Sequence, residues 1–157
     1  MRSRDQLRRD QARLVSRVCG GFMLRSVMTM AGLLGADYAL AVVYVAILQA
    51  NLAGLDDDPA LAARYAGLDD IVPDSLHRPI SVHALAHSLH MPYETTRRCV
   101  GRLIDRGFVV RVSRNGVVAR SARLAEPDCR RVVEQDYGEA MRMIAQLRRL
   151  GVDLDGA

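Results

Sequence analysis

One stretch of the sequence decides the fold, ISVHALAHSLHMPYETTRRCVGRLIDRGFVVRVSRNGVVAR, from Ile80 to Arg120. Ser81 can cap a helix because its hydroxyl accepts a hydrogen bond from a backbone N–H of the first turn. Apolar residues then recur at helical spacing as far as a turn that favours a positive φ at His90, and Pro92 suits the start of a new helix. The pattern predicts two short helices around a tight turn, the second from about residue 92 to residue 106.

A β-hairpin is expected directly after the second helix. Gly107 suits a left-handed helix end, and a β-rich run continues from Phe108 to Val112. Asn115-Gly116 is a strong signal for a short hairpin turn, and two valines return after it. Residues 108–120 are therefore expected to form a hairpin with Arg114 at its tip.

The second helix has two chemically different faces. At about 100° per residue, one face is expected to pack inward, with Thr96, Cys99, Val100 and Leu103. The other face is expected to be free, with Glu94, Arg97, Arg98, Gly101 and Asp105. Exposed arginines near the start of a helix suit a DNA major groove, because one guanidinium can bind both acceptors of a guanine.

The segment resembles the winged helix-turn-helix domains of bacterial transcription regulators, and among these the MarR type is the most similar in length and layout. The resemblance covers about a quarter of the chain. It departs from the family at Thr96, where an aliphatic residue is usual, and at Pro92, where Ser or Thr is usual. The matching positions are Ser81, Leu85-Ala86, Leu89-His90-Met91, Thr95-Thr96, Arg98, Leu103, Gly107 and Phe108.

The resemblance implies a mainly α protein with a small β-hairpin wing (α+β) that binds double-stranded DNA and regulates transcription. Helix 92–106 would read the major groove, and wing 108–120 would contact the minor groove or the backbone. The alternatives are a winged helix that binds a protein partner without DNA and, with less support, a membrane-associated regulator. The expected DNA-binding residues are Tyr93, Glu94, Thr95, Arg97, Arg98, Arg102, Arg111, Ser113, Arg114 and Asn115.

Charge is strongly segregated along the chain. The net charge is +4, and all 22 basic residues are arginine. Residues 75–125 hold nine arginines against two acidic residues, whereas residues 31–74 hold one arginine against seven aspartates. The basic block coincides with the motif, as expected for a surface that binds phosphate, although a solvated charged face is the simpler interpretation.

Helices are also expected at both ends of the chain, in segments 1–36 and 126–157. The first carries Leu7, Leu14, Val18 and Phe22 on one side, with an interruption at Gly20-Gly21. We expect the two terminal helices to pair between subunits of a homodimer, the alternative being that they fold back on their own core. The second begins near Glu126-Pro127 and carries a stripe of Val133, Tyr137, Met141, Ile144 and Leu147.

The middle segment, 37–125, is expected to form the winged-helix domain with a connection at 56–78. Residues 38–55 contain no charge and reach the lower length limit of a transmembrane helix. Gln49 and Asn51 interrupt this run and acidic residues flank it, so a buried core helix of a soluble, cytoplasmic protein is favoured, with no membrane partner. The connection has a short helix around Ala60 to Tyr65 and either covers the core or forms part of a site for a small-molecule effector.

The remaining reactive side chains give weak signals. His83 and His87 lie four residues apart on one helical face, but two ligands rarely make a metal site, so neither a metal nor a cofactor is expected. Cys19, Cys99 and Cys129 have no CxxC spacing and fit a reducing compartment, and whether they sense redox state is left open. No motif for phosphate binding or nucleophilic catalysis is present in the sequence, so an enzyme is not expected.

Overall fold

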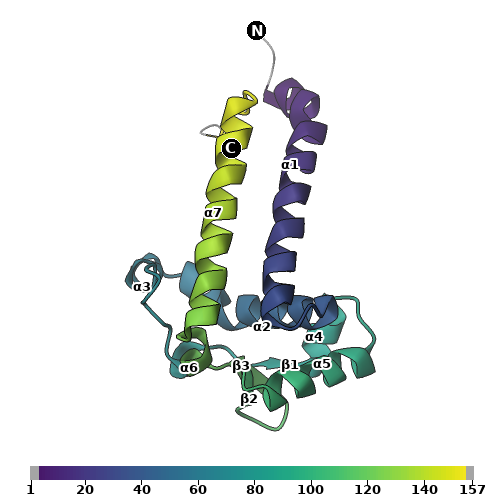
Figure 1. Cartoon of the computed structure of the whole chain (residues 1–157), viewed down its shortest axis with the longest axis vertical. Coiled ribbons are helices and arrows are strands. Elements are labelled where there is room, and N and C mark those ends of the chain that lie inside the picture. The colour runs from purple at the N-terminus through teal and green to yellow at the C-terminus, as the bar shows by residue number, and fades with distance from the viewer. Residues whose placement is uncertain (1–3, 155–157) are drawn as a thin grey trace.

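The computed structural model describes residues 4–154. The chain is mainly helical and carries a small antiparallel sheet of three strands in the order β1-β3-β2. Figure 1 shows α1 and α7 rising side by side from a base formed by the other elements. The elements are α1 (Arg4–Leu33), α2 (Tyr38–Asp56), α3 (Pro59–Arg64), the 3-10 turn η1 (Asp74–Leu76), β1 (Ile80–Ser81), α4 (Val82–Ser88), α5 (Tyr93–Asp105), β2 (Val109–Arg111), β3 (Gly116–Ala119), α6 (Ser121–Leu124) and α7 (Pro127–Arg149).

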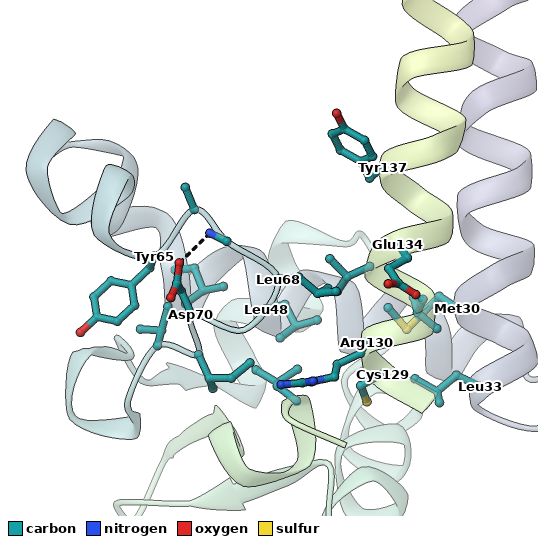
Figure 2. A pocket seen from close by; sticks show the side chains of 18 of the residues that line it. Met30, Leu33, Leu48, Tyr65, Leu68, Asp70, Cys129, Arg130, Glu134 and Tyr137 are labelled. Carbon is teal, nitrogen blue, oxygen red and sulfur yellow. Dashed lines mark hydrogen bonds between the residues drawn. The ribbon is translucent and has the colours of Figure 1, made fainter. Parts of the chain in front are cut away.

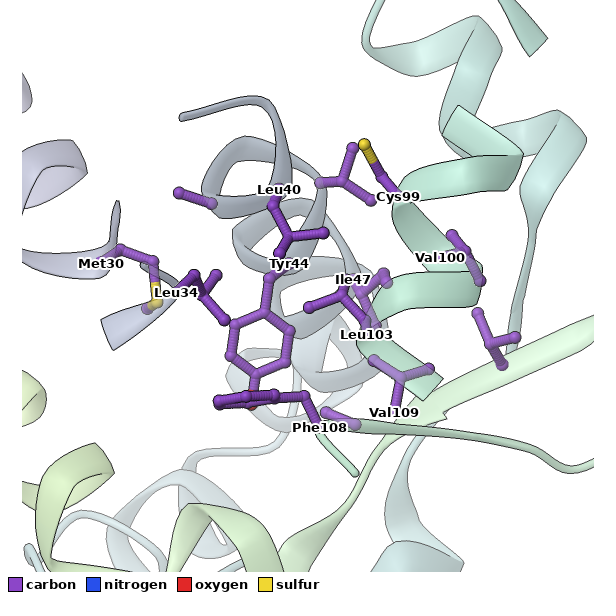
Figure 3. Packing of buried hydrophobic residues seen from close by; sticks show 14 of the residues in the cluster. Met30, Leu34, Leu40, Tyr44, Ile47, Cys99, Val100, Leu103, Phe108 and Val109 are labelled. Carbon is purple, nitrogen blue, oxygen red and sulfur yellow. The ribbon is translucent and has the colours of Figure 1, made fainter. Parts of the chain in front are cut away.

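The centre of the core is α2, the uncharged helix. By length and composition α2 could cross a membrane, and one third of its apolar window is buried. Its buried side packs against α5 and β3, and Tyr44 meets Phe108 edge-on with the ring centroids 5.3 Å apart. Figure 3 shows Leu40, Tyr44 and Ile47 of α2 facing Leu103 of α5 across this core. The core-helix interpretation of residues 38–55 therefore agrees with the packing of this face.

A buried amide joins α2 to the sheet. Asn51 is 1% exposed, and its side-chain oxygen accepts a hydrogen bond from the backbone N–H of Ala119 at 2.8 Å. Its amide nitrogen donates to the backbone carbonyl of Arg78 at 2.7 Å. The side chain satisfies main-chain groups of β3 and of the segment before β1, which explains why a polar residue is kept in an apolar helix.

The sheet aligns the motif with the core. β3 pairs with β2 through Val109↔Ala119 and with β1 through Ile80↔Val117. Gly116 begins β3 in a crowded position, because an added Cβ there would lie 2.9 Å from the Cβ of Pro79 and 2.6 Å from the hydroxyl of Ser113. A glycine is needed at residue 116 for this close approach.

The terminal helices α1 and α7 pack against each other as an antiparallel pair, which we call the stalk. Arg25 of α1 forms an ion pair with Glu139 of α7 at 2.5 Å, and the Gln11 side chain donates to the Gly151 carbonyl at 3.0 Å. The expected interruption at Gly20-Gly21 was wrong, because α1 continues through both glycines. Packing along the stalk compensates the roughly 1 kcal/mol that each glycine costs inside a helix.

The predicted apolar side is confirmed for α1 and is wrong for α7. Val18 is buried and Leu14 and Phe22 are half-buried as expected, while the side chain of Leu7 lies outside the described residues. On α7 the predicted stripe is not the packed side, because Val133, Tyr137 and Met141 are exposed. The buried positions of α7 are Cys129, Val132 and Leu147, so only Leu147 of the stripe is buried.

Acid is expected to destabilise the fold through carboxylates that hold hydrogen bonds. Both guanidinium ends of Arg123 donate to Asp128 at 2.6 and 2.7 Å, which lowers the pKa of Asp128 to about 2. Because the pKa is lower in the folded state, this stabilisation is present above pH ~4 and is lost as pH falls toward 2. Urea unfolding from pH 7 to pH 2.5 should show that Asp128→Asn loses less stability on acidification than the unmodified chain.

The control for this experiment is Asp105→Asn at an exposed aspartate that forms no ion pair in the described part of the chain. Between pH 7 and pH 2.5 this variant should lose as much stability as the unmodified chain. An equal acid response in all three proteins would contradict the assignment to Asp128.

Candidate nucleic-acid interface

Two hydrogen bonds and two left-handed residues fix the ends of α4 and α5 and the turn between them. Ser81 caps α4 as predicted, and its hydroxyl accepts from the N–H of Ala84 at 3.1 Å. His90 has φ 51° and Gly107 has φ 76°, which confirms the two predicted left-handed positions. The N–H of Met91 donates to the carbonyl of Ala86 at 3.0 Å and closes the turn between α4 and α5.

The two predicted faces of α5 are confirmed. Thr96, Cys99, Val100 and Leu103 are buried against the core, whereas the arginines of the opposite face are exposed. The unusual Thr96 is accommodated because its hydroxyl donates to the carbonyl of Pro92 at 3.2 Å. A buried hydroxyl with a partner inside its own helix adds no unpaired polar group to the core.

The arginines on the outer face of α5 differ in what they contact. Arg97 is paired with Glu94 through two hydrogen bonds of 2.8 and 2.6 Å, and this pair lowers the pKa of Glu94. The guanidinium of Arg98 makes no hydrogen bond or ion pair within residues 4–154. Tyr93 is exposed at the start of the helix, and its ring lies 6.4 Å from that of His83. Arg98 therefore has all its donors available for a ligand.

Arg102 is fixed by a contact that the sequence did not indicate. Its guanidinium donates to Asp37 at 2.5 Å, and Asp37 also caps α2 by accepting from the N–H of Leu40 at 2.9 Å. Both hydrogen bonds lower the pKa of Asp37, and the bond from the Leu40 N–H has the larger effect. The ion pair ties the start of α2 to the outer side of α5, so Arg102 has fewer donors for a ligand than Arg98.

The hairpin after α5 is confirmed, but its turn differs from the prediction. Residues 112–115 form the loop, and neither Asn115 nor Gly116 has a positive φ, so a tight Asn-Gly turn is absent from this hairpin. The Ser113 hydroxyl accepts from the Gly116 N–H at 2.8 Å, so this residue shapes the loop. Arg111 and Arg114 are exposed, and the guanidinium of Arg114 has no hydrogen-bond partner in the described chain.

The helix and the loop lie at one end of the molecule. Figure 1 places α5 and the β2–β3 loop at the base, opposite to the free ends of the stalk. Residues 93–120 contain seven arginines and two acidic residues, a net charge of +5. This end of the protein is a cationic surface built on a helix and a hairpin, and it suits a polyanionic ligand.

The histidines and cysteines form no metal-binding group. Among the described residues, no three His, Cys, Asp or Glu side chains come together, and His83 and His87 are exposed. Cys99 and Cys129 are buried, and burial raises the pKa of both thiols, whereas Cys19 is half-buried. A raised pKa reduces the thiolate fraction on which oxidation depends.

Comparisons with protein-family models, with curated proteins and with solved structures found no match to this chain.

Proposed function

We propose that residues 80–120 form a winged helix-turn-helix that binds double-stranded DNA, and that the protein is a transcription regulator of the cytoplasm. α5 is the recognition helix for the major groove, and the β2–β3 loop contacts the minor groove or the phosphates. The observation that carries the proposal is the outer face of α5, which presents arginines while the inner face is packed in the core.

The order of the elements supports the same proposal. β1, α4, α5, β2 and β3 follow one another, and β3 returns to pair with β1 as well as with β2. This arrangement suits a winged helix of the kind found in MarR-type regulators, which the sequence resembles. The charge of the α5 and hairpin surface favours DNA over a neutral protein partner.

Arg98→Ala is expected to weaken binding to the preferred DNA sequence. A bidentate contact between arginine and guanine contributes about 1–3 kcal/mol of discrimination, so the preference over a mutated site should fall by that amount. Fluorescence anisotropy with fragments selected from the source genome would measure it. The free energy of unfolding should change by less than about 0.5 kcal/mol, since the Arg98 side chain is exposed and has no partner among the described residues.

Arg114→Ala is expected to have a different signature. A contact from the hairpin loop to phosphate carries no sequence information, so binding should weaken on all fragments alike. The slope of the logarithm of affinity against the logarithm of salt concentration should fall by about 1. A salt titration on preferred and random fragments separates this result from that of Arg98→Ala.

The matched control for both variants is Arg64→Ala, an exposed arginine at the end of α3 in the acidic part of the chain. DNA binding should be unchanged in this variant. If Arg98→Ala and Arg114→Ala also leave binding unchanged, the surface is wrongly assigned, and a protein partner for the winged helix becomes the better proposal.

The exposed apolar side chains of the stalk support a homodimer. Met23 is 63% exposed, Leu24 60% and Met28 50%, an unusual density of large apolar groups at the surface of one helix. A two-fold dimer would place two α5 helices on the two halves of a palindromic site. We therefore assign the pairing between subunits to the α1 side of the stalk.

Light scattering at micromolar concentration should give twice the monomer mass. Replacing Leu24 and Met28 by Asp should yield monomers, because charged groups would have to be buried at the interface. Ser16→Asp, which adds one negative charge at an exposed polar position of α1, should remain dimeric. A monomer for the unmodified chain would contradict the dimer.

A further inference from the structure

A cavity of about 760 Å³ lies between α2, residues 65–72 and the first turns of α7. Figure 2 shows Leu48 and Leu68 inside it, Met30 and Leu33 at one side, and Tyr137 at its upper edge. The lining is mainly apolar, and the volume is within the range of sites for small molecules. None of the DNA-binding residues proposed above contributes to it.

The outer wall of the cavity is built by the connection between α2 and β1. Asp70 accepts a hydrogen bond from the N–H of Gly67 at 2.9 Å, which closes a turn of this wall (Figure 2). Arg130 reaches from α7 toward the same segment and forms an ion pair with Asp69. The middle of the wall is therefore fixed by a turn and by an ion pair to α7, while the space behind it is left unfilled.

Two buried polar atoms of the lining residues have no hydrogen-bond partner among the described residues. They are the hydroxyl of Tyr44, a residue that is 1% exposed, and the Nε of Arg130. Burial raises the pKa of Tyr44 well above its usual value, so the hydroxyl keeps its proton and can donate. Buried donors without partners are costly, and an acceptor placed in the cavity would satisfy them.

The charges around the cavity decide what kind of acceptor fits. Two carboxylates, Asp70 and Glu134, and one arginine line the cavity, and that arginine, Arg130, is already paired with Asp69, so an added anion would meet a net negative charge. We propose that this cavity binds a neutral apolar molecule whose carbonyl or ether oxygen accepts from Tyr44 and Arg130. The site is assigned from the cavity and its unpaired donors and does not depend on DNA binding.

Tyr44 connects the cavity to the DNA-binding unit. Its ring packs on Phe108, which follows the last residues of α5 and precedes β2 (Figure 3). The guanidinium of Arg123 lies 4.2 Å from the centre of the Phe108 ring on the side of α6. A ligand that moves Tyr44 must therefore move the junction of α5 and the hairpin, and so change the affinity for DNA. This regulatory step rests on the proposed DNA-binding function.

Prodan, a neutral naphthalene ketone with environment-sensitive fluorescence, is a suitable probe. The protein should bind one prodan per chain with a blue shift of the emission, and more tightly than the anionic anilinonaphthalene sulfonate. Tyr44→Phe should weaken prodan binding about fivefold, the effect of one lost hydrogen bond, yet raise the melting temperature of the protein without dye. Opposite signs for binding and stability would not arise from a merely structural hydroxyl.

Two further variants locate the dye. Leu48→Trp fills the cavity and should reduce prodan affinity at least tenfold, whereas Met141→Gln, on the same side of α7 but outside the lining, should not change it. Melting temperatures verify that both variants fold. Unchanged affinity in Tyr44→Phe, or an equal loss in Met141→Gln, would overturn the site, as would the absence of any binding.

The regulatory step is tested separately with the selected DNA fragment. Prodan should reduce DNA affinity in the unmodified chain and have no effect in Leu48→Trp. Dye binding without an effect on DNA would overturn the coupling but not the site. Loss of DNA binding in the absence of dye would instead count against the proposed function, so the two failures are distinguishable.

Discussion

Leu103→Ala is expected to reduce the free energy of unfolding by about 2–5 kcal/mol. Leu103 is completely buried between α5 and α2, beside Tyr44 and Ile47 in the centre of the core. Truncation removes apolar contacts and leaves a cavity. The packing of α5 against its neighbours prevents the helix from moving to fill it. Urea unfolding followed by circular dichroism should show a lower midpoint with an unchanged slope.

The matched control is Leu76→Ala, the same substitution at a leucine that is 39% exposed in η1. It should cost less than about 1 kcal/mol, because little apolar surface is removed from contact. Equal losses in both variants would show that α5 is not anchored by Leu103. DNA binding by Leu103→Ala should weaken only to the extent that the variant is unfolded, because the residue lies on the inner face of α5 and does not contact DNA.

Asn51→Ala is expected to reduce the free energy of unfolding by about 2–4 kcal/mol. The variant leaves the N–H of Ala119 and the carbonyl of Arg78 without their partner, and each buried group left unsatisfied costs about 1–3 kcal/mol. Hydrogen exchange should show where the structure is destabilised. The backbone amide of Ala119 should lose more protection from exchange than the amides of the stalk.

Gln49→Ala is the control for Asn51→Ala, since it removes an amide from the exposed side of the same helix. Its effect should stay within about 0.5 kcal/mol. Asn51→Asp adds a second test: it keeps an acceptor for Ala119 but turns a second oxygen toward the Arg78 carbonyl. Greater stability of Asn51→Asp than of Asn51→Ala at neutral pH would contradict the role of the amide as a donor.

Features set by neighbouring residues could be predicted from the sequence. The Ser81 cap, the left-handed His90 and Gly107, and the start of α7 at Pro127 were confirmed because each depends on local backbone chemistry. The inner face of α5 was also confirmed, since helical spacing alone places Thr96 with the apolar residues.

Features set by distant residues were missed or wrong. Helix α1 continues through Gly20-Gly21 because α7 packs beside it, and no local pattern reports that neighbour. The hairpin loop is shaped by Ser113 instead of a tight Asn-Gly turn, in a place where Pro79 crowds Gly116. The cavity requires Tyr44 and Arg130 to approach from helices more than 80 residues apart, so sequence spacing gave no sign of it.

The pairing of the first and last long helices also has a consequence for synthesis. α1 leaves the ribosome well before its partner α7, which is complete only after residue 149. Contacts within residues 80–120 close short loops, whereas the stalk closes a loop of about a hundred residues at a higher entropic cost. We expect the order of assembly to differ from the order of synthesis: α1 is made before α7 but packs only after α7 is complete. During translation its apolar side chains stay exposed, so a nascent chain truncated before residue 127 should bind chaperones that a chain containing α7 escapes.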